Sequence, residues 1–147
     1  MISVDGVDCR VNEPRRLPST EWFSHKSNGP GLSYELGISI YESRLVWMRG
    51  PERAGKLGDL KTFQAPNGLK SKIPAGKKVI GDKAYKYPVC SIRNPLDSRE
   101  VKDFKSRARA RHESFNGRIK KFRVLAVAFR HRLSTVGILP LPLATAR

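Results

Sequence analysis

The chain has 147 residues, of which 29 are Lys or Arg and 13 are Asp or Glu, so its formal net charge is +16 at pH 7. This length suits one domain with a modest core, and a hydrophobic content of 39 % excludes a wholly disordered tail. The excess of positive charge indicates a polyanionic partner, with nucleic acid favoured over an anionic membrane. A small ribosomal-type protein would have the same charge, so charge alone leaves that alternative open.

The two cysteines, Cys9 and Cys90, are far apart and have no CxxC or Cys/His spacing around them. We therefore expect reduced thiols, no zinc site and no disulfide framework. No apolar run is long enough to span a bilayer, and residues 1–5 lack the basic-then-apolar order of a signal peptide. These features predict a soluble, intracellular protein with no membrane partner.

The first half of the chain predicts strands. Residues 1–5 form a short strand stopped by Gly6, and 9–31, rich in Pro, Ser, Asn and Gly, form a loop. Residues 32–40 and 44–48 alternate and are separated by a short turn, which is typical of a hairpin.

Shorter elements follow the hairpin. Gly50–Pro51 is expected to break the pattern, 59–63 to form a short helix, and 77–81 to form a strand that ends at Asp82. The order of strand, hairpin, helix and strand predicts a mixed α/β fold.

A long amphipathic helix is the clearest predicted element. Asp97 and Glu100 suggest a capping box, and the helix is expected to continue to about Phe129. Residues 131–147 are expected to form an unstructured tail, which leaves 1–130 as the domain. One apolar stripe is expected to pack on the sheet, with the members Val101, Phe104, Ala108, Phe115, Ile119, Phe122 and Ala126.

Polar residues form a second stripe on the same helix. Arg109, Glu113, Asn116 and Lys120 recur at helical spacing, so they share one face. One interpretation is a solvated surface with an Arg–Glu pair. The other is a functional face that directs one acid toward a site.

Two aspartates favour the second interpretation. Asp5 and Asp82 each end a predicted strand, and the carboxyl ends of strands are where α/β sites gather. Singly, each is more often a turn former or a cap. Clustered carboxylates repel unless a cation lies between them, and oxygen ligands favour Mg²⁺ or Mn²⁺.

Five short segments then carry a family resemblance. Their order along the chain, from about residue 3 to 130, resembles that of DDE transposases of the Harbinger kind and their bacterial insertion-sequence relatives. The segments are Ser3-Val4-Asp5-Gly6-Val7-Asp8, Trp22-Phe-Ser-His-Lys26, Gly50-Pro51 with Asp59-Leu60, Asp82-Lys-Ala-Tyr85, and Arg109-x3-Glu113-x6-Lys120. The family's Asp-x-Gly-Tyr motif has Ala84 in place of Gly.

The resemblance implies an α/β, RNase H-like mixed sheet flanked by helices, acting as a metal-dependent DNA endonuclease or transposase domain. Asp5, Asp82 and Glu113 would be the catalytic residues and would hold two Mg²⁺ or Mn²⁺ ions that act on the scissile phosphate. Asp59 would be a further metal ligand, with the N-cap of its helix as an equally weighted alternative.

The same resemblance implies DNA as the partner, contacted by Lys26, Arg109 and Lys120, for which ordinary surface charge is the alternative. It leaves room for a separate DNA-binding partner protein, because we expect the chain to be a fragment without the family's upstream DNA-binding region. A nuclear location is expected in a eukaryote. Two alternatives stay open: an inactive transposase remnant that only binds nucleic acid, and an unrelated basic RNA-binding protein.

Overall fold

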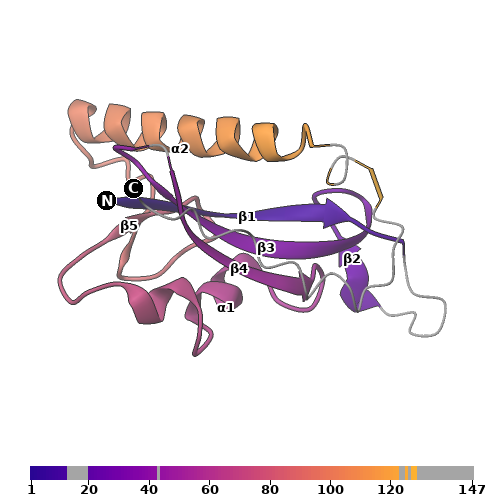
Figure 1. The fold of residues 1–147 in the computed structure, drawn as a ribbon. Coiled ribbons are helices and arrows are strands. Elements are labelled where there is room, and N and C mark those ends of the chain that lie inside the picture. The colour runs from indigo at the N-terminus through magenta and orange to yellow at the C-terminus, as the bar shows by residue number, and fades with distance from the viewer. Residues whose placement is uncertain (13–19, 43, 123–124, 126, 129–147) are drawn as a thin grey trace, which may run out of the picture.

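The computed structural model describes residues 1–12, 20–42, 44–122, 125 and 127–128. These residues form a mixed sheet with α-helices on both of its faces (Figure 1). The expected tail at 131–147 and the stripe residue Ala126 lie outside the described residues.

The sheet has antiparallel strands on one side of β1 and parallel strands on the other. Its order is β2–β3–β1–β5–β6, with β4 also paired to β3. β3 runs antiparallel to β1 and β4, whereas β5 is parallel to β1 and β6 is parallel to β5. The predicted mixed α/β class is therefore confirmed. The strands are β1 (Ile2–Arg10), β2 (Phe23–Ser24), β3 (Gly29–Ser39), β4 (Leu45–Arg53), β5 (Val79–Ile80) and β6 (Cys90–Ser91).

The two α-helices cover opposite faces of the sheet, with α2 above and α1 below in Figure 1. Successive side chains of β1 alternate between them, as the pleat of a strand requires. Ser3 forms a hydrogen bond of 2.9 Å with Nδ1 of His112 on α2, whereas Val4 packs on the α1 side in a buried cluster. The helices are α1 (Asp59–Gln64) and α2 (Arg99–Ile119), with 3₁₀ turns at Thr20–Trp22 and Leu69–Lys72.

The largest core cluster lies on the α1 side. Its rings meet edge to face, with the centroids of Phe63 and Tyr85 5.8 Å apart, and both residues are fully buried. Burying a large apolar side chain contributes about 1.5–3 kcal/mol, so this cluster holds the turn after β5 against the sheet. The buried members are Val4, Phe63, Leu69, Val79, Tyr85 and Cys90.

The expected breaks in the strands are wrong at two glycines. β1 does not stop at Gly6 but continues to Arg10, because the whole segment stays in antiparallel register with β3. The loop expected over 9–31 is correspondingly shorter, since β3 already begins at Gly29. β4 also passes through Gly50–Pro51, where Gly50 adopts φ +138° and a Cβ would lie 2.6 Å from the Tyr34 ring. At Gly6 the pairing with β3 outweighed the local turn preference, whereas at Gly50–Pro51 the strand continues with a shift of register against β3 between Ser33 and Glu35.

The cap of α2 differs from the expected one. Ser98 is the N-cap and accepts a hydrogen bond from the backbone N–H of Val101, at 3.4 Å. Asp97 does not cap the helix, because its carboxylate accepts hydrogen bonds from Lys105 Nζ at 2.7 Å and from the Asn94 N–H at 3.2 Å. The ion pair with the long side chain of Lys105 therefore takes up the Asp97 carboxylate that was expected to cap the helix.

The end of α2 and its buried face also differ from expectation. The helix ends at Ile119 rather than near Phe129, and Phe122, expected on the buried stripe, is 67 % exposed. Val101 is 41 % exposed, although Phe104 and Ala108 do pack on Ile40 and Ile80. The buried positions of α2 include Lys105 and His112, which the stripe omitted because they are polar. Each has a partner: Lys105 donates to the Ile92 carbonyl at 2.9 Å, and His112 meets Ser3.

No helix in the part of the chain that the structure describes is both long enough and apolar enough to cross a membrane.

Candidate active site beside the first strand

Asp5 lies in the middle of β1 and faces α2, not at a strand end as predicted. Its carboxylate accepts one hydrogen bond from the backbone N–H of Gly6 at 2.8 Å and another from Asn116 Nδ2 at 3.0 Å. Burial raises the pKa of Asp5; the Lys26 ammonium and the Gly6 N–H oppose this, and the carboxylates of Asp59 and Asp82 raise it further. Two other predicted acids therefore lie near enough to Asp5 to affect its pKa.

Asp82 follows the strand that runs beside Asp5. β1 and β5 are parallel, with Ser3 paired to Ile80, so Asp82 lies just beyond the carboxyl end of β5. Its carboxylate accepts a hydrogen bond from the Ala84 N–H at 2.8 Å, and its carbonyl accepts one from the Tyr85 N–H at 3.2 Å. The buried ring of Tyr85 anchors this turn, which explains the aromatic residue three positions after the acid.

Asp59 is the first residue of α1 and is not its N-cap. The N-cap is Gly58, and no side chain caps it, so the capping alternative is wrong. The Asp59 carboxylate lies directly over Gly6, where a Cβ would be 2.3 Å from Oδ1. It forms an ion pair of 3.2 Å with Lys26, and the Asp59 side chain is only 19 % exposed.

Lys26 contacts Asp59 and the backbone of Gly6 on the α1 side of the sheet. Its ammonium donates to the Gly6 carbonyl at 2.9 Å and to Asp59. Burial lowers the pKa of Lys26, but the carboxylates of Asp59, Asp8 and Asp5 act more strongly together and raise it overall. Lys26 therefore carries a full positive charge at the place where the sequence suggested a metal or a phosphate.

The segment before Lys26 is anchored by a buried pair that the sequence did not single out. Ser24 Oγ donates to Asp8 Oδ2 at 2.5 Å, and the Ser27 N–H donates to Ser24 Oγ at 3.2 Å. Because Asp8 and Gly6 lie on the same side of β1, this pair holds the Trp22–Lys26 segment beside Asp59. The signal in the sequence was a second aspartate, Asp8, three residues after Asp5.

On the polar stripe of α2, the residue that touches Asp5 is Asn116. Glu113 is exposed, and Asn116 is half-buried with its amide toward the strand. A carboxylate can only accept, so the amide nitrogen must face Asp5 and the oxygen is turned away. That Oδ1 is buried and has no hydrogen-bond partner within the described residues. The sequence placed Asn116 on the correct face but did not select it, because spacing alone does not rank the members of a stripe.

The two basic members of the stripe differ in their surroundings. Arg109 is half-buried along α2, and Lys120 is exposed at its C-cap. Burial raises the pKa of the Cys9 thiol in β1, and the Lys120 ammonium opposes that shift. Since Cys9 and Asp5 share a face of β1, Lys120 lies on the same side of the sheet as Asp5.

A second acid that the sequence did not select lies opposite Gly6 in the sheet. Glu35 is buried and pairs in register with Gly6. Its Oε2 accepts hydrogen bonds from Trp47 Nε1 at 2.9 Å and from the Leu69 N–H at 3.2 Å. Burial raises the pKa of Glu35, and the nearby Asp59 carboxylate adds to the shift. Its acidic place in an otherwise apolar stretch of β3 was the signal.

Among the described residues, no three His, Cys, Asp or Glu side chains are grouped so that they could hold one metal ion. The chemistry of the donors nevertheless fits a hard cation, because the Asp82 carboxylate is near enough to raise the pKa of Asp5 and carboxylate oxygens are the ligands such a cation prefers. Glu113 is exposed and would have to turn inward to join them. Asp59 lies over Gly6 on the α1 side of the sheet, paired with Lys26, whereas Asp5 faces α2 on the other side, so the structure does not bring Asp59 together with Asp5 as one group of ligands.

Comparison with models of protein families, with curated proteins and with solved structures gives no match.

Proposed function

We propose that the chain is a metal-dependent DNA-cutting domain of the DDE transposase kind with an RNase H-like fold. The observation that carries the proposal is the parallel pairing of β1 with β5, which puts Asp5 and Asp82 on neighbouring strands within electrostatic reach. The resemblance requires this juxtaposition, with the long helix facing the same strand.

Each residue then has a distinct task. Asp5 and Asp82 would hold the cations, together with Glu113 from α2. Asn116 would position Asp5 through its amide N–H. When bound, a pair of divalent cations would supply charge stabilisation at the scissile phosphate and an ionised nucleophile. Lys120 and Arg109 would contact the phosphates that flank it, since cationic side chains positioned on one helix face neutralise a backbone.

The raised pKa of Asp5 supports this assignment. Acids whose burial and like-charged neighbours disfavour ionisation gather at functional sites more often than elsewhere. A bound cation would reverse that penalty, because it favours the ionised carboxylates that it contacts.

A specific observation favours the second candidate, an inactive domain that only binds nucleic acid. Lys26 neutralises Asp59, Glu113 is exposed, and the described residues contain no ready group of three ligands. These features are also compatible with a site that closes on cation and DNA.

The test is nicking of supercoiled DNA in Mg²⁺ or Mn²⁺ by the wild type and by Asp5→Asn, Asp82→Asn and Glu113→Gln. We expect weak nicking, stronger in Mn²⁺ because Mg²⁺ demands near-ideal octahedral geometry. Each site variant should lose it, whereas Asp103→Asn, which removes an exposed acid from the outer face of α2, should retain it. Equal nicking by Asp82→Asn would indicate a contaminant and leave the binding-only candidate.

A further inference from the structure

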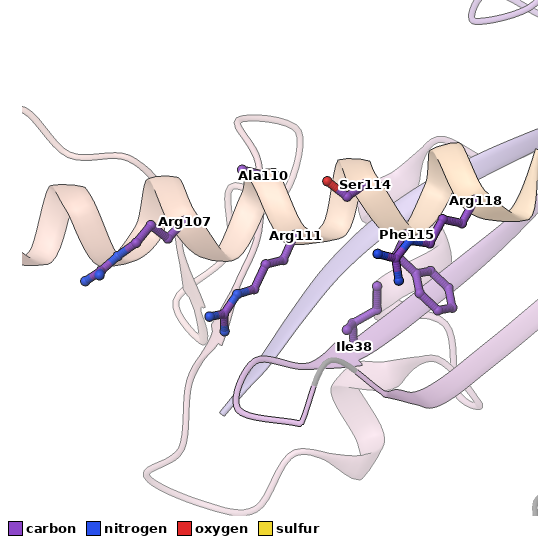
Figure 2. Close-up of a pocket in the computed structure, with 7 residues that line it drawn as sticks. All are labelled: Ile38, Arg107, Ala110, Arg111, Ser114, Phe115 and Arg118. Atoms are coloured by element: carbon purple, nitrogen blue, oxygen red, sulfur yellow. The ribbon is translucent and has the colours of Figure 1, made fainter.

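A basic hollow lies on the flank of α2 opposite to the one where Asn116 contacts Asp5. It has a volume of about 390 Å³ and lies between α2 and the end of β3. Figure 2 shows Arg107, Arg111 and Arg118 extending from one side of the helix, with Arg111 and Arg118 directed toward the sheet end that bears Ile38. None of its seven lining residues is acidic.

The three arginines form a row along the helix axis. They occur at i, i+4 and i+11, so they share one face of α2. At 1.5 Å per residue they span about 16 Å, which matches about five base-pair steps of 3.4 Å on one DNA strand. A planar guanidinium can donate two parallel hydrogen bonds to a phosphate, which makes arginine the preferred side chain for this contact.

The charges of the row are available for an external anion. Only Arg111 has an internal partner among the described residues, the carbonyl of Ile40, at 2.5 Å. Arg107 and Arg118 make no ion pair among the described residues, whereas Lys105 on the same helix pairs with Asp97. Ile38 and Phe115 give the hollow an apolar floor suited to the sugar edge of a strand.

The outer surface of α2, between the arginine row and the flank with Lys120, carries small side chains. Ala110, Ser114 and Gly117 are exposed there, and a Cβ at Gly117 would meet nothing within 4 Å. The outer surface of α2 could therefore enter a groove of a duplex, with one strand along the arginine row and the other along the Lys120 flank. The helix is about 10–12 Å wide with its side chains, which is close to the width of about 12 Å of the major groove of B-DNA.

We infer that the row of Arg107, Arg111 and Arg118 binds the phosphodiester backbone of duplex DNA, so that one strand follows the row and the outer surface of α2 lies in a groove of the duplex rather than along the edge of the sheet. The inference rests on the proposed function only in taking DNA as the partner. The acids would act on one flank of α2 while the row holds the duplex on the other.

The test is binding of a fluorescent random duplex, followed by anisotropy over a range of salt concentrations, in EDTA and with Asp82→Asn as background. The double variant R107Q/R118Q spares Arg111 and its contact with Ile40. We expect severalfold weaker binding, and a salt dependence whose log–log slope falls by about two, since each phosphate contact contributes about 0.9.

The matched control removes the same charge elsewhere. Lys77 and Lys78 are exposed in the turn before β5, so K77Q/K78Q should change the slope much less. Equal losses in the two double variants would overturn the inference, because they would show a general charge effect. A larger loss on double-stranded RNA than on DNA would also overturn it.

The outcome is separable from that of the cutting experiment. Binding is measured without a cation and in a background that cannot cut, so loss of binding in R107Q/R118Q supports the row even if the wild type never nicks DNA. Nicking with unchanged binding in R107Q/R118Q would support the proposed function and refute the row.

Discussion

Asn116 on α2 donates a hydrogen bond of 3.0 Å to the carboxylate of Asp5 on β1, across 111 positions of sequence. This contact joins the two elements on which the candidate site depends. It also fixes the rotation of the helix above the strand, because the half-buried carboxylate needs a donor there.

Asn116→Ala should therefore destabilise the fold. Removing the donor leaves a half-buried carboxylate with one fewer hydrogen bond, at a cost of about 1–3 kcal/mol in the free energy of unfolding. Chemical denaturation at neutral pH measures this. Glu113→Ala is the control on the same helix, since exposed positions usually stay within about 0.5 kcal/mol. Equal losses in the two variants would contradict the contact.

Gly6→Ala should cost about 1–3 kcal/mol, because its Cβ would lie 2.3 Å from Asp59 Oδ1 and overpacking forces a displacement. Combining it with Asp59→Ala should recover part of the loss, since the obstructing carboxylate is then absent. A double-mutant cycle by denaturation gives the coupling. Gly29→Ala, with nothing within 4 Å of its Cβ, is the control. A purely additive cycle would exclude the close approach.

Millimolar Mg²⁺ or Mn²⁺ should raise the melting temperature. A cation at ten times its Kd stabilises the folded state by about 1.4 kcal/mol. For a chain of this size that corresponds to a rise of about 3–6 °C. Asp82→Asn should abolish the rise without unfolding the protein, and Asp103→Asn should keep it. A rise that is unchanged in Asp82→Asn would remove Asp82 from the cation site.

His112 should make stability depend on pH. Burial lowers its pKa to about 4 from an ordinary 6.5, so between these values the unfolded chain binds a proton that the folded chain does not. Its contribution is complete above pH 6.5 and is lost as the pH falls, by up to about 1.4 kcal/mol per unit. The raised pKa values of Asp5 and Glu35 act oppositely at the acid end of this range.

The difference in free energy of unfolding between wild type and His112→Gln isolates the histidine. It should grow from pH 4 to 6.5 in favour of the wild type and then stay level. The exposed His25→Gln is the control. A difference in free energy of unfolding that does not change with pH would contradict the prediction, because it would mean that the pKa of His112 is the same in the folded and unfolded chains.

The sequence by itself determined the basic charge, the order of the longer strands and the two α-helices, and part of the buried face of α2. These follow from composition and from periods of two and 3.6 residues, which are local properties. It also associated Asp5 with β1 and Asp82 with β5, which proved to be neighbours, although the two residues are level because of the register between the strands and not because both strands end there.

Only the tertiary structure decided which residues of those patterns meet. The choice of Asn116 over Glu113 depends on how α2 is rotated on β1, and the pairing of Asp59 with Lys26 depends on the closeness that Gly6 permits. Likewise, Lys105 draws Asp97 away from the helix cap, and register with β3 carries β1 past Gly6. Each outcome is set by contacts that the three-dimensional arrangement brings about, most of them between distant segments, whose free energies exceed the local preferences that a sequence displays.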